Sequence, residues 1–170
     1  MTTFYLTVRF LHVLAGAMWV GFAVFSAFFL MPAIQEAGPD GGKVMAALER
    51  RGVVALIPII VTVTILSGLW LYWRYTGGFS PEISRSHAGM AFGTGGALAI
   101  LAAIIGIGVV SRSLAKASAL MKQAMTLPEA QRASVLAPVP GLRQRAMMGA
   151  RIVAVLVIIT IGLMSVGLLL

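Results

Sequence analysis

Two histidines are the residues of this chain best suited to bind a metal. His12 and His87 are its only histidines, and each lies in an otherwise apolar stretch. An ionisable side chain inside a bilayer is costly, so it indicates a functional site. Neutral imidazole is a good ligand for iron and for copper. We therefore take both histidines as candidate metal ligands and ask which elements would position them.

The composition indicates that those elements are membrane-spanning helices. The chain has 170 residues, of which 59% are hydrophobic and 11% charged, whereas a soluble domain has about 25% charged residues. Its four apolar runs are each long enough for a helix to cross about 30 Å of hydrocarbon. We predict an all-α fold, an integral membrane four-helix bundle forming one domain over residues 1–170. The expected spans are 4–31, 53–75, 83–110 and 147–170, with a cytoplasmic loop at 111–146.

Proline, glycine and capping residues predict where the helices begin. A helix is expected to restart near Lys43 and to run into the second span, with a kink at Pro58. Ser80-Pro81-Glu82 has the pattern of an N-cap, a proline at the first helical position and an acidic first turn, so the third span should begin near Pro81. That helix is expected to continue into the 111–146 loop. The capping-box spacing of Thr126 and Glu129 predicts a short amphipathic helix there.

The positive charges are unevenly divided between the two sides of the bundle. Seven Lys or Arg residues follow the third span and three lie between spans one and two, which makes ten. The other side has Arg9, Arg74 and Arg85. The positive-inside rule places the two richer loops in the cytoplasm and both termini outside. We expect a multi-pass protein of a bacterial-type inner membrane. Because topology accounts for the net charge of +8, the expected partner is the lipid bilayer and not nucleic acid.

The two histidines are expected at similar depth. Spans one and three run in the same direction, so depth can be counted from their outer ends. His12 lies nine residues after a helix start at Thr3, and His87 lies six residues after Pro81. At about 1.5 Å per residue, these depths are about 13 and 9 Å. If the two helices are close, the imidazoles can face each other across a flat cofactor, which favours b-type haem.

The residues near the histidines have the sizes and charges that such a cofactor needs. Small side chains on the same helix face leave room for a macrocycle, an aromatic ring can pack against its edge, and arginine pairs well with propionates. Small residues at this spacing are more often positions of helix packing than parts of a cofactor pocket. The expected cofactor-binding residues are Gly16 and Trp19 near His12, Ala91 and Gly95 near His87, and Arg9, Arg74 and Arg85 for the propionates.

The first span resembles a known membrane family. Its segment Leu11–Gly21, in which His12 is followed by six residues, Trp19, one residue and Gly21, is similar to the copper-resistance-D-like superfamily of small membrane modules. Similar segments occur in the membrane part of cytochrome-tailed urate oxidases, and more loosely in membrane protoporphyrinogen oxidases. The resemblance implies a four-helix membrane domain with b-type haem or copper, and it matches His12 and Trp19 to the motif. The chain lacks a cytochrome c tail and the arginine- and tyrosine-rich end of the first span found in protoporphyrinogen oxidases.

Three functions remain open at this point. The first is electron transfer by a b-type haem with two histidine ligands, with a membrane quinone or a redox protein as partner. The second is copper binding or transport, since Met90 lies three residues from His87 and a thioether with imidazole suits Cu(I). The third is an accessory structural subunit whose histidines only form hydrogen bonds. A homo-oligomer is compatible with each of them.

Other chemistry is poorly supported by the residues present. The chain has no cysteine, which excludes disulfides, thiolate-bound metals and covalently attached haem. Its five acidic residues lie in loops or at helix ends, so neither a proton pump nor a hydrolase is indicated. Whether the chain is a redox enzyme in its own right is left open.

Overall fold

Four long apolar helical stretches make up most of the protein. The computed structural model describes residues 2–169, and no strand occurs among them. The stretches Thr3–Glu36, Ala55–Tyr75, His87–Met125 and Glu129–Gly167 are long and apolar enough to cross a membrane. The predicted all-α, four-helix membrane architecture is therefore confirmed. Met1 and Leu170, the two ends of the expected domain, lie outside the described residues.

Several of these stretches contain breaks or wider π-helical turns. In chain order, the elements are α1 (Thr3–Phe25), the π-helix η1 (Ser26–Leu30), α2 (Met31–Glu36), the 3-10 helix η2 (Gly38–Asp40), α3 (Gly41–Arg50), α4 (Val53–Tyr75), α5 (Pro81–Ser84), α6 (His87–Ile105), the π-helix η3 (Gly106–Ser111), α7 (Arg112–Met125), α8 (Glu129–Leu136) and α9 (Val139–Gly167).

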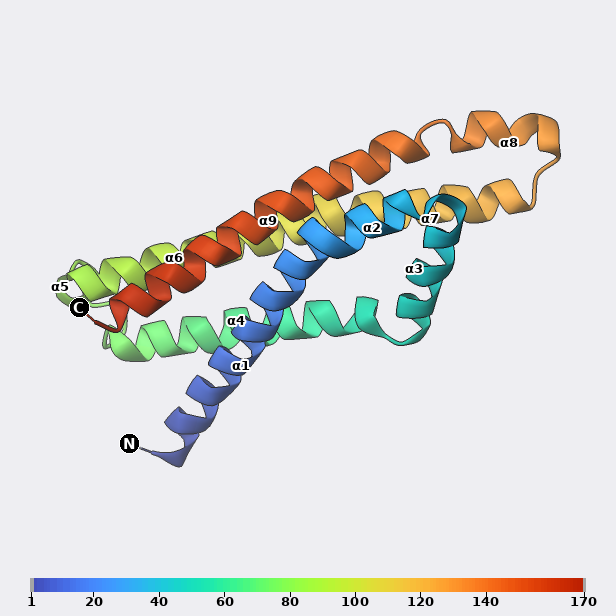
Figure 1. Cartoon of the computed structure of the whole chain (residues 1–170). Coiled ribbons are helices and arrows are strands. Elements are labelled where there is room, and N and C mark those ends of the chain that lie inside the picture. The colour runs from blue at the N-terminus through green and yellow to red at the C-terminus, as the bar shows by residue number, and fades with distance from the viewer. Residues whose placement is uncertain (1, 170) are drawn as a thin grey trace.

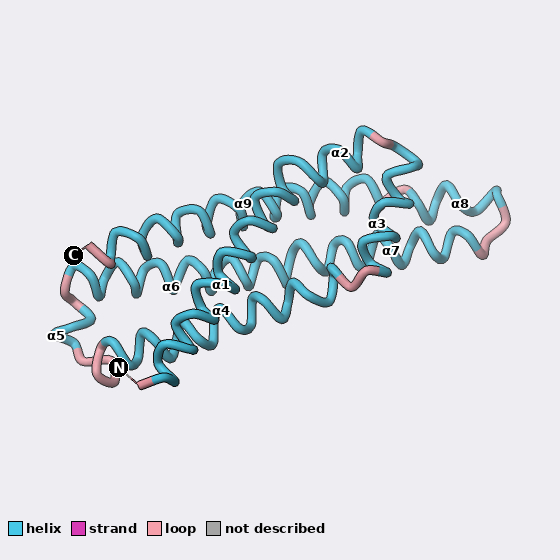
Figure 2. Tube along the Cα trace, turned by 60° about the horizontal axis from the view of Figure 1, so that its bottom comes forward, coloured by secondary structure: helices cyan, strands magenta, loops and turns pink. Residues whose placement is uncertain are grey.

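Three of the long helices run side by side, and the fourth crosses them. Helices α4, α6 and α9 are roughly aligned, and α7 continues the line of α6, whereas α1 runs obliquely across the bundle (Figure 1). The most extensive contacts join α6 to α9 and α1 to α4. Loops are nearly confined to the two ends of the bundle, as Figure 2 shows. We call the end with both termini and residues 76–80 the terminal end, and the end with Gly38 and Thr126 the loop end.

Small side chains fill the centre of the bundle. In a membrane, small residues allow helix backbones to approach closely, and this packing replaces the hydrophobic effect as the main attraction between helices. Trp19 is the one large ring in the buried cluster and is only 5% exposed. All four long helices contribute to this cluster: Ala15, Trp19 and Ala23 from α1, Ile60 from α4, Ala99 and Ala102 from α6, and Val153 and Val157 from α9.

Two predicted helix continuities are wrong. The helix expected from Lys43 into the second span is broken at Gly52, whose φ of 77° is a left-handed conformation that glycine adopts readily. The third span does not begin at Pro81, because α5 ends after four residues and a new helix begins at His87. Ser86 caps this second start by accepting a hydrogen bond from the backbone N–H of Gly89 at 3.1 Å.

The loop end agrees with the sequence in outline and differs in detail. The third helix does continue beyond the apolar span, through η3 and α7 to Met125, and α8 is the expected short helix. The predicted capping box is wrong, since Pro128 is the N-cap of α8 and the Thr126 hydroxyl donates to the carbonyl of Gln123 instead of accepting from a backbone N–H of α8. The last helix begins at Val139, eight residues before the expected start of the fourth span at residue 147.

The buried cluster gives a first testable prediction. Ala102 is fully buried where α6 meets its neighbours, whereas Ala97 on the same helix is exposed. Ala102→Leu should destabilise the protein by about 1–3 kcal/mol, because extra methylene groups do not fit a packed core. Ala97→Leu is the matched control and should leave stability nearly unchanged. The thermal unfolding midpoint in detergent measures both, and equal shifts would contradict this account of the core.

Candidate functional site

His12 lies where α1 packs against α4, with its ring held by polar groups of α4. Its Nδ1 atom is 3.0 Å from the carbonyl oxygen of Thr64 and 3.1 Å from the hydroxyl of Ser67. The Ser67 hydroxyl itself donates to the carbonyl of Val63, one turn earlier in α4. The imidazole is therefore joined to the neighbouring helix at a fixed position within the span.

These partners determine which ring nitrogen is protonated. A carbonyl oxygen only accepts hydrogen bonds, so Nδ1 of His12 must be the N–H donor to Thr64. In the neutral ring, the lone pair is then on Nε2, the nitrogen that a metal would bind. A hydrogen bond from Nδ1 to a backbone carbonyl is the usual way in which proteins orient a ligating histidine. The site thus presents a pre-oriented nitrogen ligand.

Gly68 makes the close approach of His12 possible. A Cβ atom at this position would lie 2.7 Å from Cε1 of the His12 ring, which is too close for any side chain. On either side along α1, further contacts hold the same two helices together. Phe4 stacks edge-to-face on Trp70, with ring centroids 5.2 Å apart, and Gly16 lies against the side chain of Thr64. The His12 ring fills a space that α4 leaves open for it.

His87 occupies a different environment. It is the first residue of α6 and its side chain is exposed, so it lies at the terminal end and not six residues inside a helix. The depth match expected from a helix start at Pro81 does not hold. The hydrogen bonds of His12 run to α4, and the main neighbours of α6 are α9 and α4. The structure does not set the two imidazoles against each other.

The expected cofactor-binding residues lie in separate parts of the bundle and do not line one common pocket among the described residues. Gly16 belongs to the His12 region, and Trp19 is buried in the core cluster. Gly95 faces α9, where a Cβ atom would lie 3.1 Å from Cε of Met164, and Ala91 is half-buried on the same helix. The three arginines expected near the propionates, Arg9, Arg74 and Arg85, are exposed. Arg74 also lines a hollow of about 280 Å³ at the terminal end, with Trp73, Gly77 and Gly78.

Sequence reasoning missed the α4 residues that hold His12. Thr64, Ser67 and Gly68 are small or polar positions at helical spacing in an otherwise apolar span, and this pattern could have indicated a polar contact on one face of the helix. It does not reveal which helix lies opposite. Among residues 2–169, no group of three or more His, Cys, Asp or Glu side chains could hold a metal ion. Haem requires only one or two axial ligands from the protein, so it is compatible with an isolated histidine.

Comparisons with protein-family models, with curated proteins and with solved structures found no match. The functional argument therefore rests on the geometry around His12.

The contact with Gly68 gives the second prediction. Gly68→Ala should displace the His12 ring and lower the free energy of unfolding by about 1–3 kcal/mol, the usual cost of overpacking. Gly16→Ala is the matched control in the same helix pair, since its Cβ would lie an ordinary 3.7 Å from Thr64 and alanine favours helix. Thermal unfolding in detergent measures the difference. A Gly68→Ala protein as stable as the control would show that His12 does not pack here.

Proposed function

We propose that this protein binds b-type haem through His12 and transfers electrons in the membrane. The observation that carries the proposal is the intramembrane imidazole whose Nδ1 is bonded to the carbonyl of Thr64 at 3.0 Å, which leaves Nε2 available as a ligand. The contacts of Nδ1 fix the ring, so that Nε2 is presented in one direction. Haem, when bound, supplies the one-electron redox chemistry.

The residues around His12 would serve to hold this ligand. Thr64 and Ser67 fix the orientation of the ring, and the bond to a carbonyl raises the basicity of Nε2. The surrounding apolar side chains of α1 and α4 exclude water. An apolar surrounding disfavours the more highly charged oxidised iron, so it would raise the reduction potential. The protein thus contributes a ligand, its orientation and a dry environment.

His87 would supply the second ligand in this proposal, which requires the start of α6 to move toward the α1–α4 pair that holds His12. Its side chain is exposed at the first residue of α6, so its ring nitrogens are open to ligation. Two histidine ligands would leave the iron no open position for a substrate, which favours electron transfer over chemistry on a substrate. The outer arginines would pair with the propionates, and a membrane quinone or a redox protein would exchange electrons with the haem.

The proposal extends to the placement of the protein in the membrane. Ten of the thirteen Lys and Arg residues lie between the first and second or between the third and fourth apolar runs, so these connections would face the cytoplasm and both termini the outside. A bacterial-type inner membrane is the corresponding location. Membership of the copper-resistance-D-like superfamily, suggested by the His12–Trp19 segment, belongs to the same hypothesis.

Absorption spectra test the proposal directly. Full-length protein purified after haem-replete expression should show a Soret band and, after reduction with dithionite, sharp α and β bands. His12→Ala and His87→Ala should each abolish this six-coordinate spectrum, because each removes one ligand. Phe10→Ala is the matched control, since it truncates a ring that is 64% exposed on the same helix as His12, and it should retain the spectrum.

Each alternative outcome has a defined meaning. A colourless wild-type protein would overturn haem binding, and metal analysis of the same sample would then detect any copper. Loss of the bands in His12→Ala but not in His87→Ala would refute the two-histidine ligation while keeping His12 as a ligand. Equal loss in Phe10→Ala would attribute the effect to misfolding of α1.

A structural role is the second candidate, and the same contacts favour it. His12 joins α1 to α4 through two hydrogen bonds and fills the space above Gly68, as a histidine retained only for helix association would do. In this case His12→Phe should lower the thermal midpoint of a colourless protein, whereas His87→Phe should not. An accessory subunit of a larger membrane complex is the function that this result would support.

A further inference from the structure

A groove at the loop end lies between the third and fourth long helices. Its volume is about 440 Å³, and it is lined mainly by apolar side chains. Ile105 and Val109 form one wall, from the end of α6 and from η3, and Met148 and Ile152 of α9 form the other. Gly141 lies in the lining near the start of α9, where no other atom would approach a Cβ within 4 Å. The groove therefore extends from the apolar run of α9 back toward the start of that helix.

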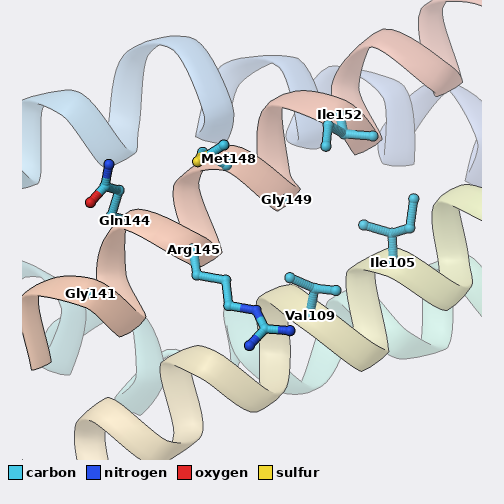
Figure 3. A pocket seen from close by; sticks show the side chains of 8 residues that line it. All are labelled: Ile105, Val109, Gly141, Gln144, Arg145, Met148, Gly149 and Ile152. Carbon is cyan, nitrogen blue, oxygen red and sulfur yellow. The ribbon is translucent and has the colours of Figure 1, made fainter. Parts of the chain in front are cut away.

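The lining of the groove includes one cationic side chain. Arg145 extends from α9 toward the turn that carries Val109 (Figure 3). The one ion pair among the described residues joins Lys43 to Asp40, so the guanidinium of Arg145 is not neutralised by a carboxylate. The nearby Arg143 is directed elsewhere, since its Nη2 lies 3.1 Å from the sulfur of Met121 on α7. Arg145 thus remains available to an anion at the mouth of an apolar groove.

The position of Arg145 along α9 corresponds to the headgroup layer of a bilayer. The continuous apolar run of α9 begins at Ile152, directly after Arg151. Arg145 lies seven residues before Ile152, which corresponds to about 10 Å along the helix. The headgroup layer of one leaflet is about 5–8 Å thick, and a long arginine side chain can reach along its helix toward it. The guanidinium would therefore lie at phosphate level, with the apolar walls extending into the hydrocarbon.

We propose that an anionic glycerophospholipid of the surrounding bilayer binds in this groove. Its phosphate pairs with Arg145, and an acyl chain lies along the outside of the seam between η3 and α9, against Ile105, Val109 and Ile152. Arginine suits this contact because its planar fork can bind two phosphate oxygens at once. A groove that is apolar on the membrane side and cationic at the headgroup end matches a phospholipid better than it matches a soluble anion. The inference is independent of haem binding.

Lipid titration of the full-length, delipidated protein in detergent tests the proposal. Dioleoyl phosphatidylglycerol and dioleoyl phosphatidylcholine are compared by native mass spectrometry and by the thermal midpoint, which a ligand of the folded state raises. We expect one phosphatidylglycerol to bind about fivefold more tightly than phosphatidylcholine, the effect of one basic side chain beside an anionic lipid. Arg145→Gln should remove this preference. Gly141→Leu places a side chain in the open space at this position, so it should weaken the binding of both lipids.

Arg143→Gln is the matched control, because it removes an equal charge two residues away from a side chain directed to Met121. It should keep the preference for phosphatidylglycerol. Equal binding of both lipids by the wild type, or an equal loss in Arg143→Gln, would overturn the proposal in favour of a diffuse positive surface. Full competition by inorganic phosphate would indicate a simple anion site instead. A lipid-free dimer that Arg145→Gln dissociates would show that the groove receives a second copy of the chain.

Discussion

Close contact between helix backbones is the constraint on which this structure depends. Lipid tails are as apolar as leucine, so burying apolar area does not by itself hold membrane helices together. Alanines supply the contact instead, and Ala27, Ala102 and Ala154 are fully buried where the long helices meet. The same close approach brings the His12 ring within hydrogen-bonding distance of the α4 backbone. A polar site inside this bundle is therefore a consequence of how tightly the small residues allow it to pack.

The position of Gly68 explains how a helix carbonyl can accept an extra bond. In an α-helix, the carbonyl of one residue points toward the residue four positions later, and Gly68 stands four positions after Thr64. A side chain at that place would cover the carbonyl, whereas glycine leaves the room that the His12 ring occupies. No water is available at this depth to satisfy an imidazole N–H. The hydrogen bond between His12 and the carbonyl of Thr64 therefore depends on glycine at position 68.

Features that depend on a single helix, such as its length and its extent, could be predicted from the sequence. Apolar length gave the four spans, and alternating polar and apolar residues gave the extension of the third helix through α7. The break before His87 was harder, because a helix does begin at Pro81, and only the folded chain shows that it ends after four residues and that Ser86 caps a second helix. The partner of His12 could not be found in this way. Helical periodicity defines the face on which His12 lies, but which helix covers that face is decided by packing across the whole bundle.

Helix α9 connects the two polar features at opposite ends of the bundle. Toward the loop end it carries Arg145 and one wall of the groove, and farther along it contributes Val153 and Val157 to the cluster that includes Trp19 of α1. The residues that hold His12 lie on α4, beyond this cluster toward the terminal end. The two sites also differ in electrostatics. The Nδ1 atom of His12 has its hydrogen-bond partners within the protein, whereas no carboxylate of the described residues pairs with the guanidinium of Arg145. The bundle therefore orients His12 from within, whereas Arg145, like the arginines of the terminal end, depends on its surroundings to balance its charge.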